Sequence, residues 1–535
     1  MIAQDIDSAS QDQAKQSGTD DLPPLPLSPI EKAKEDGTAL LMSLRDVTKM
    51  ALQYNLDIAI QDTNEETSQL QLIAAEAAYD PNLTFNISLN SRKGANTNRA
   101  TANPTLDFYT SRNIQWNAGF SQPLKTGGSF DVSWDTTRQS SDTDFSLLNP
   151  SYSTGASITF NQPLWQNLRI DQNRGNIKLR KLDLETTDSQ FKQTVTSTIA
   201  NIQSTYWDLV AAIEDYKIKR SSVELAQINL RDNKKKVEVG TMAPIEVTDA
   251  EANVASREVQ LITAEEAILR QENALRRLIS NDRNHEVWSK VIVPIDTPDF
   301  SEYKVDSFEA INTALKNRPE LEQYDIQLKQ SDISLKMNDN SRKWLVNLVG
   351  TFGSSGEAGD PQPTSPPQPE RRIGGIGQAY SNLFTEGLIN WTLRVNLDIP
   401  LRNRAADSQY AQQMISRRKI QMQRKNQEQQ IQVEIRNALQ SIETNRKQVE
   451  TAGVARRLAE ERLDGEEKRF EAGLSQNYLV LQRQNELSSA QYTELQALIS
   501  YKKAIINLQQ SMYTLLESNE FEIAKDSSSN VPNLQ

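Results

Sequence analysis

Two stretches of this sequence contain no proline and almost no glycine over a length that few folds can accommodate. One lies between Pro163 and Pro244 and the other between Pro400 and Pro532. Both are rich in Gln, Glu, Lys, Arg, Leu and Ala, which favour the α-helix. About 70 residues at a rise of 1.5 Å each form a rod on the order of 100 Å, longer than the helices of globular domains. The sequence therefore predicts two helices of unusual length.

Apolar residues in these regions recur with the spacing of a coiled coil. The seams run through Ile199, Ile202, Tyr206, Leu209, Ile213 and Tyr216, through Val247, Ala250, Val254, Leu261, Ile268, Leu275 and Leu278, and through Leu498, Tyr501, Ile505, Leu508, Met512 and Leu515. A sustained seven-residue repeat indicates helices that pack side by side along their length. The apolar stripe of an ordinary helical bundle would explain any one of these seams. Several long helices share the pattern, however, and this favours a coiled coil.

The order of elements occurs twice, which indicates an internal duplication. Ala51–Ile58 is similar to Ala314–Leu321, at an offset of 314 − 51 = 263 residues. Val237–Gly240 is similar to Phe470–Gly473, at an offset of 473 − 240 = 233 residues. In each half the glycine ends a long helix and a second helix follows. Each half is therefore expected to contain a helix, strands, a very long helix, a tight turn and a helix.

The predicted strands alternate apolar and polar residues. The apolar positions are Leu83, Phe85, Ile87 and Leu89; Ile114, Trp116, Ala118 and Phe120; Phe130, Val132 and Trp134; Ile158 and Phe160; and Trp391, Leu393, Val395, Leu397 and Ile399. Period two indicates a half-buried strand, as in a soluble sandwich. A polar face of Asn, Gln, Ser, Thr, Arg and Asp, with aromatic residues near the strand ends, also suits a water-filled transmembrane barrel. Loops at 138–149 and 353–390 are expected to be mobile, solvent-facing tips.

These patterns divide the chain into five parts. We expect a Pro-rich extended segment over 1–42; a first repeat over 43–280, with strands within 83–163 and helices 167–239 and 245–280; a connecting segment over 281–306; a second repeat over 307–516, with strands within 344–400 and helices 402–472 and 477–516; and a tail over 517–535.

Composition excludes several classes of function. The 535 residues include no cysteine and one histidine, His285, so disulfides, thiolate zinc sites, Cys nucleophiles and a lipoprotein cysteine are excluded. The net charge of 59 − 71 = −12 argues against a nucleic-acid binder. Only 37% of residues are hydrophobic and the mean hydropathy is −0.63, which disfavours one large core. No apolar run is long enough for a membrane helix, and residues 1–7 do not resemble a signal peptide.

Several motifs together resemble the TolC family of outer-membrane efflux and secretion channels, over roughly residues 43–516. The matching pieces are Ala51-Leu52 and Ala314-Leu315, Pro81-Asn82-Leu83, the strand-to-helix motifs Asn161–Leu164 and Asp398–Leu401, and the hairpin tips Val239-Gly240 and Ala472-Gly473. No single motif is decisive, but their order, spacing and duplication are specific.

The resemblance implies an α+β membrane protein in which a homotrimer forms one outer-membrane β-barrel, continuous with a long α-helical coiled-coil tunnel through the periplasm. It implies a passive exit duct of a tripartite efflux pump or type I secretion system. The implied partners are a periplasmic adaptor and an inner-membrane pump, with no cofactor and no metal. It also implies adaptor contacts at the tips Val239, Gly240, Ala472 and Gly473; glycine as a helix cap explains the two glycines equally well.

Two features depart from the family pattern. The family has two strands per half, whereas residues 114–135 form an extra candidate hairpin, which either widens the barrel to six strands per subunit or forms a flap. At the periplasmic constriction, Leu479 and Gln482 stand where the family often has two acids, and Ser475 takes the basic position. With Glu246 and Asp249 on the first hairpin, we expect a hydrophobic or polar constriction rather than an aspartate ring.

No motif in the sequence supports an enzymatic function. Gly374–Gly377 follows a Pro-rich loop rather than a strand, and no Walker A motif is present. His285 has no second base or ligand nearby in sequence. The alternative to a channel is a soluble periplasmic coiled-coil scaffold or adaptor, which would have one helical hairpin rather than two. The sequence does not identify the cargo.

Overall fold

The computed structural model describes residues 27–95, 107–142, 146–363 and 365–518. These residues form two compact units. The first unit contains the described residues up to 64, then 189–322 and from 425 onward; the second contains 65–188 and 323–424. The division falls within four helices, α4 (Leu56–Glu76), α5 (Gln172–Glu238), α8 (Pro319–Ser341) and α10 (Arg404–Glu471).

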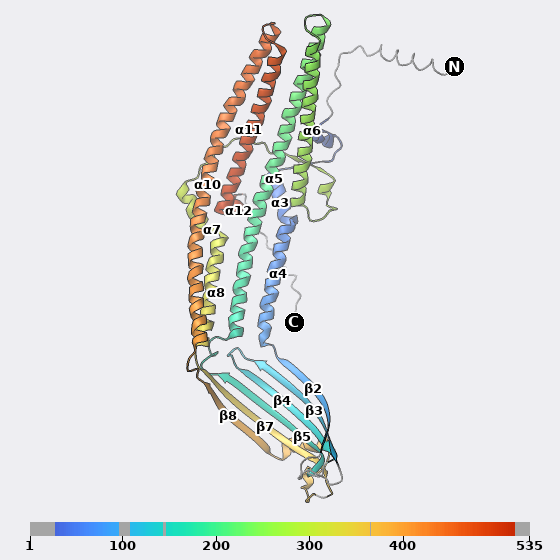
Figure 1. The fold of residues 1–535 in the computed structure, drawn as a ribbon, viewed down its shortest axis with the longest axis vertical. Helices are drawn as coiled ribbons and strands as arrows, with labels where there is room; N and C mark the ends of the chain where they lie inside the picture. The colour runs from blue at the N-terminus through green and yellow to red at the C-terminus, as the bar shows by residue number, and fades with distance from the viewer. Residues whose placement is uncertain (1–26, 96–106, 143–145, 364, 519–535) are drawn as a thin grey trace, which may run out of the picture. The chain divides into compact units, whose positions relative to one another are not determined.

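The second unit contains one antiparallel sheet of six strands in the order β2-β3-β4-β5-β7-β8 (Figure 1). The strands are β2 (Asn82–Ala95), β3 (Phe108–Pro123), β4 (Ser129–Ser141), β5 (Leu148–Pro163), β7 (Leu345–Pro361) and β8 (Leu388–Asp398). The candidate hairpin of residues 114–135 lies inside this sheet as parts of β3 and β4, so it is not a separate flap.

The connection from β7 to β8 differs from the expected mobile loop. Strand β7 extends to Pro361, and the connection contains the short turn η4 (Glu370–Arg372) and the helix α9 (Ile376–Thr385). Helix α9 packs on the sheet, and its Ala379 and Leu383 are fully buried. The expectation for 353–390 was therefore wrong, because strand pairing and helix docking order much of this segment.

The first unit contains two helical hairpins (Figure 1). One is the C-terminal part of α5 with α6 (Ile245–Ile279), and the other is the C-terminal part of α10 with α11 (Asn477–Met512). The coiled-coil seams predict the buried residues well, since Ile199, Ile202, Tyr206 and Leu209 are all fully buried in one apolar cluster. A second cluster joins α7 (Ser307–Asn317), α10 and α11.

Short elements complete the first unit. Strands β1 (Ala39–Met42) and β6 (Val291–Pro294) pair in parallel, beside helices α2 (Pro29–Glu35) and α3 (Leu44–Tyr54) and the turn η3 (Glu286–Trp288). The expected extended segment over 1–42 is thus a helix and a strand over most of 29–42; its residues 1–26 lie outside the described chain, as does the predicted tail from 519 onward. A short helix, α12 (Leu515–Ser518), follows α11.

Helix bounds lie close to those expected. Helix α5 starts at 172 rather than 167, because the segment after Pro163 first makes a turn in which Asn167 has φ +66°. Helix α11 ends at 512 rather than 516, where Tyr513 takes a left-handed conformation. In the part of the chain that the structure describes, no helix combines the length and the apolarity needed to cross a bilayer.

Candidate functional site

One face of the six-stranded sheet is apolar across every strand. Directly paired residues share a face, so the register places Leu83, Phe120, Val132, Ile158, Phe352 and Trp391 in a single cross-strand row. The neighbouring row contains Phe85, Ala118, Trp134, Ala156, Ser354 and Ile389. Many of these side chains are exposed, Leu83 by 76% and Trp391 by 74%. We call this surface the apolar belt.

The belt has the dimensions of a membrane-facing surface. On β8 the apolar positions run from Ile389 to Leu397, or 397 − 389 + 1 = 9 residues. A tilted transmembrane strand needs about 9–11 residues. A continuous exposed apolar surface of this kind is disfavoured in water and suits contact with lipid.

The opposite face of the sheet is polar. Side-chain hydrogen bonds cross it between neighbouring strands: Asn86 donates to Asn117 (3.1 Å), Ser133 and Ser157 pair at 2.8 Å, and Thr159 and Thr351 pair at 3.3 Å. Such a face is compatible with a water-filled lumen. The sheet therefore has one apolar surface and one polar surface.

Both edges of the sheet are open. Among the described strands, β2 and β8 each have a neighbour on one side only. Every residue of β8 is exposed, and nearly every residue of β2. Because the strand number is even and all pairs are antiparallel, the two edge strands run in opposite directions. A second copy of the sheet can therefore add to either edge in antiparallel register.

At one end of the sheet the strands join the helices. The turn after Pro123 fits closely there: Gly127 has φ +86°, and a Cβ on it would lie 2.4 Å from the carbonyl oxygen of Asn167. Asn167 is also bound to Asn340 at the end of α8, since the Nδ2 of Asn340 donates to its Oδ1 (2.8 Å). These contacts fix the strand ends against the helix ends.

The predicted tip residues lie at the ends of the two helical hairpins. Gly240 and Gly473 both have a left-handed backbone, with φ +78° and +71°, and a Cβ on either would meet open space. The amide of Thr241 bonds to the carbonyl of Lys236, and that of Leu474 to the carbonyl of Arg469. Both turns are thus glycine helix caps.

The tips also expose apolar side chains. Val239 is 72% exposed and Leu474 is 81% exposed, and Ala472 is exposed beside them. The two hairpins contact each other just behind the tips, where the Lys236 ammonium lies 3.8 Å from the centre of the Phe470 ring. Both tips therefore offer apolar contacts to a partner.

The four residues expected at the constriction occupy different environments. Asn477 of the second hairpin donates to Glu246 of the first (3.4 Å), and Asp249 is exposed. Leu479 is half-buried, whereas Gln482 is exposed and donates to Glu486 (3.3 Å). Of the four expected residues, Glu246 therefore takes part in a hydrogen bond between the two hairpins.

Ser475, at the position of the family's basic partner, remains within its own hairpin. Its hydroxyl donates to Glu466. Nearby, burial raises the pKa of Glu467, although a hydrogen bond from Gln484 opposes this shift. Glu466 and Glu467 are thus bound by neutral partners.

Sequence reasoning missed a buried cation between the hairpins. Arg257 of α6 is 4% exposed, and its guanidinium donates to Ser222 of α5, to Asn253 (2.9 Å) and to Asn485 of α11 (3.0 Å). Position 257 falls between Val254 and Leu261 in the predicted seam. An arginine at an otherwise apolar heptad position is the feature of the sequence that indicates this buried cation.

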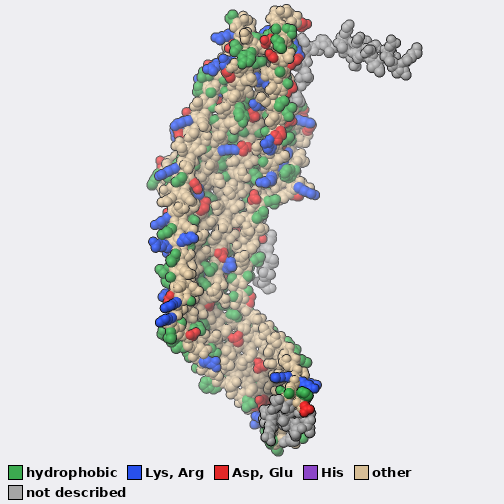
Figure 2. All heavy atoms as spheres, in the orientation of Figure 1, with side chains coloured by type: hydrophobic (Ala, Val, Ile, Leu, Met, Phe, Trp, Pro, Cys, Tyr) green, Lys and Arg blue, Asp and Glu red, His purple; other side chains and the backbone are tan. Residues whose placement is uncertain are grey.

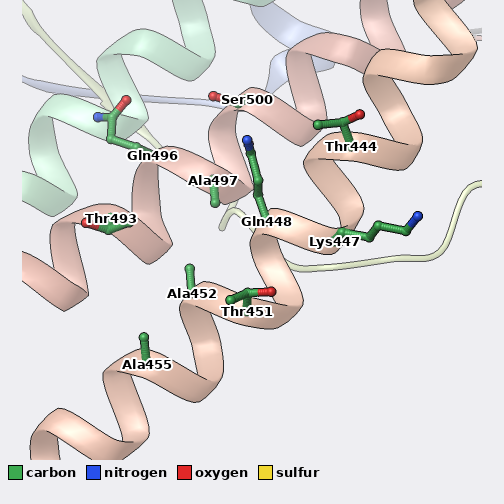
Figure 3. Close-up of a pocket in the computed structure, with 10 residues that line it drawn as sticks. All are labelled: Thr444, Lys447, Gln448, Thr451, Ala452, Ala455, Thr493, Gln496, Ala497 and Ser500. Carbon is green, nitrogen blue, oxygen red and sulfur yellow. The ribbon is translucent and has the colours of Figure 1, made fainter.

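An open groove runs between α10 and α11, with a volume of about 690 Å³ (Figure 3). Short side chains line it, including Ala452 and Ala455 from α10 and Ala497 and Ser500 from α11. On the face drawn in Figure 2, Lys and Arg are interspersed with Asp and Glu along the helices. In the described residues no cluster of His, Asp and Glu could hold a metal.

Comparisons with known proteins agree with this geometry. The sequence matches the family described as outer membrane efflux protein over residues 129–281 and 310–512. No curated protein matches the chain significantly.

Solved structures share the fold at low sequence identity. The CmeC outer membrane channel of Campylobacter jejuni superimposes with a TM-score of 0.63 at 17% identity, over 91% of this chain and 88% of that one. The outer membrane protein VceC of Vibrio cholerae superimposes with a TM-score of 0.61 at 15% identity, over 88% of this chain and 95% of that one. The open state of the MtrE outer membrane channel of Neisseria gonorrhoeae superimposes with a TM-score of 0.59 at 15% identity, over 88% of each chain.

Proposed function

Because this chain belongs to the outer membrane efflux protein family, we propose that three copies of it close a single barrel and form the exit duct of an export machine. Family membership makes the protein an outer-membrane efflux channel. The trimer, the barrel size, the partners and the residues that contact them are the proposal.

The observation that carries the proposal is the apolar belt together with the open edges β2 and β8. In lipid, an unpaired backbone N–H or C=O costs several kcal/mol, so an open sheet edge is strongly disfavoured there. Pairing β8 of one copy with β2 of the next removes both edges. Three copies of a six-stranded sheet give 18 strands, in the range where a barrel encloses an aqueous channel.

The alternative, a soluble coiled-coil scaffold or adaptor, leaves the belt unexplained. Such a protein would expose side chains such as Leu393 and Trp391 to water across a whole sheet face. The hydrophobic effect, about 25 cal/mol per Å² of apolar surface, opposes that arrangement.

Planar-bilayer conductance of the detergent-purified protein tests the proposal, after its mass has been measured. We expect a trimer and discrete single-channel steps. A monomer, or a trimer that never conducts, would contradict the duct and favour the scaffold.

We further propose that the tips Val239, Gly240, Ala472 and Gly473 contact a periplasmic adaptor, which links the duct to an inner-membrane pump. The exposed apolar side chains at both tips support this assignment. Val239→Asp should reduce the capture of a periplasmic adaptor by the purified protein. Glu258→Gln, an exposed change on the same hairpin, is the matched control and should leave capture unchanged.

The constriction is proposed at Glu246, Asp249, Leu479 and Gln482, on the hairpins that carry the tips. Leu479→Ala shortens an apolar side chain at this level, so single-channel conductance should increase. Gln484→Asn, at a buried position five residues further along the helix, controls for loosening of the helix. An unchanged conductance in Leu479→Ala would remove this residue from the constriction.

A further inference from the structure

Helix α9 packs on the apolar face of the sheet rather than on the polar face. Tyr380 of α9 accepts a hydrogen bond from Nε1 of Trp116 (3.1 Å) and lies 3.3 Å from the hydroxyl of Thr136. Its ring also contacts Trp134 edge to face, with centroids 5.8 Å apart. Trp116, Thr136 and Trp134 all lie on the face that carries the apolar belt.

The fit between α9 and the sheet is close. A Cβ on Gly356 of β7 would lie 2.3 Å from both the carbonyl oxygen of Ala379 and the amide nitrogen of Leu383. Glycine is therefore required at this position for the helix backbone to reach the strand. Ser354 of the same strand donates to the carbonyl of Leu383 (2.6 Å).

The register fixes the depth of α9 on the sheet. The row beneath the helix contains Ile87, Trp116, Thr136, Thr154 and Gly356. In this row β2 still carries an exposed apolar side chain, Ile87, whereas Thr136 and Thr154 are fully covered.

The next row outward carries the groups expected at the edge of a membrane. It contains Leu89, Ile114, Arg138, Tyr152 and Ala358. Arg138 and Tyr152 are directly paired, with the guanidinium 5.9 Å from the centre of the ring. Aromatic and cationic side chains on the lipid-facing side mark the boundary between hydrocarbon and headgroups. Helix α9 therefore lies on the inner side of that boundary, at the far end of the strands from the long helices.

The composition of α9 suits this position. None of its ten residues is charged. Its buried polar side chain, Asn382, donates to the carbonyls of Glu357 (2.8 Å) and Arg371 (2.6 Å), so its amide protons are bound to protein. Phe384 touches the sheet only through an edge contact with Trp134, with ring centroids 6.5 Å apart, and is 75% exposed. A helix in contact with lipid needs its polar groups satisfied internally and its outer side free of charge.

We propose that α9 is a lipid-contacting interfacial helix, held on the outside of the barrel where the hydrocarbon meets the headgroups, with Phe384 inserted into the bilayer. The helix covers the hydroxyls of Thr136 and Thr154 and the backbone at Gly356. Without the helix these polar groups would face lipid. This inference rests on the proposed function, because it requires the sheet to span the membrane.

The absence of cysteine from the chain permits a direct test with single-cysteine variants. Phe384→Cys is labelled with an environment-sensitive fluorophore, and the protein is reconstituted into phosphatidylcholine vesicles containing lipids with a nitroxide near the headgroup. We expect the emission to shift to the blue, to be quenched by the nitroxide lipid, and to resist iodide in the water. Ser381→Cys, one turn earlier on the exposed side, provides a second position that does not remove Phe384.

Two control positions on β8 separate the outcomes. Leu393→Cys lies in the middle of the apolar belt and should be quenched by a second lipid that carries its nitroxide deep in the acyl chain, whereas Asn396→Cys lies on the polar face and should be quenched by iodide. If the L393C label is not quenched by lipid, the membrane-spanning sheet and the proposed function both fail.

If L393C is quenched by lipid but the labels on α9 are quenched only by iodide, α9 lies in water and this inference alone is overturned. Protection of the α9 labels from both quenchers also overturns it, because the helix would then be covered by protein.

Discussion

At the scale of single residues, Arg257 shows how a charge is held inside a helical seam without an opposite charge. Its three hydrogen-bond partners, Ser222, Asn253 and Asn485, are neutral. Burial lowers the pKa of its guanidinium, because removing the charge from water is unfavourable. Because Asn485 belongs to the second hairpin, one of the three hydrogen bonds to the charge forms only while the two hairpins lie together.

Arg257→Met removes this link while keeping a long side chain in the seam. We expect amide hydrogens of α11 around Asn485 to exchange faster, with protection reduced by about 1 kcal/mol, since a hydrogen bond to a charged group contributes roughly 1.5–3 kcal/mol and relief of the buried charge offsets part of it. Hydrogen exchange with mass spectrometry measures this. Equal protection in Arg257→Met and in Glu258→Gln would contradict the link.

Glu31 provides a pH-dependent contact. The backbone amide of Ser28 and the guanidinium of Arg220 lower the pKa of Glu31 from 4.5 to about 2. A depressed carboxyl pKa contributes stability that is present above pH 4.5 and is lost as the pH falls towards 2. Since Arg220 belongs to α5, this contact holds α2 on the long helix.

Glu31→Gln should therefore loosen α2 at pH 7 and remove most of its acid sensitivity. The expected loss is about 0.5 kcal/mol, the size of an exposed ion pair. Hydrogen exchange of residues 29–35 at pH 7 and pH 3 measures both effects. Glu35→Gln, on the same helix, is the control. If α2 in the wild type is equally protected at both pH values, the contact does not hold it.

At the scale of elements, alternation along each strand assigns one face to lipid and the other to water. Leu393 and Asn396 lie three residues apart on β8, on opposite faces. The same charge should therefore have opposite consequences at these two positions.

Leu393→Arg should reduce the stability of the membrane-inserted protein by about 2–4 kcal/mol, the cost of a cation on the lipid face near the midplane. Asn396→Arg should cost little, because its side chain faces the lumen. Denaturant unfolding in vesicles compares the two variants. Equal losses would mean that β8 does not separate lipid from water.

At the scale of the whole molecule, the open edges require a partner. Ser88→Cys on the polar face of β2 can be combined in turn with Asn390→Cys, Thr392→Cys or Asn396→Cys on β8. Because a disulfide needs Cα atoms about 4.4–6.8 Å apart, mild oxidation should link copies into dimers and trimers for the pair in register. Non-reducing gel electrophoresis detects these species.

Ser88→Cys with Ser157→Cys is the matched control, because β5 has neighbours on both sides within its own sheet. It should give no link between copies. If the whole β8 series also gives none, the barrel is not closed by pairing of β8 with β2.

Much of the fold follows from local patterns. The alternation at Phe85 and Leu393 predicts which face is apolar, and the absence of proline and glycine predicts α5 and α10 to within a few residues. The left-handed tips at Gly240 and Gly473 follow from the need for positive φ after a helix. These features depend on neighbours along the chain, so the sequence contains the necessary information.

Other features depend on segments far apart in the chain. Strands β1 and β6 pair through only four residues each, at a separation of about 250 residues. Neither is long enough for an alternation of apolar and polar residues to identify it as a strand. The contact of Arg257 with Asn485 spans 228 residues. No local pattern specifies which distant group fills the space beside a given side chain.

The sequence by itself determined the long helices, the duplicated order, the two-faced strands and the family. The tertiary structure decided that the extra hairpin continues the sheet, that α9 covers the apolar face, and that a buried arginine joins the hairpins. The physical reason is that periodicity fixes which side of an element avoids water. Only tertiary packing determines whether that side of the element then contacts a strand, a helix or, at the apolar belt, lipid.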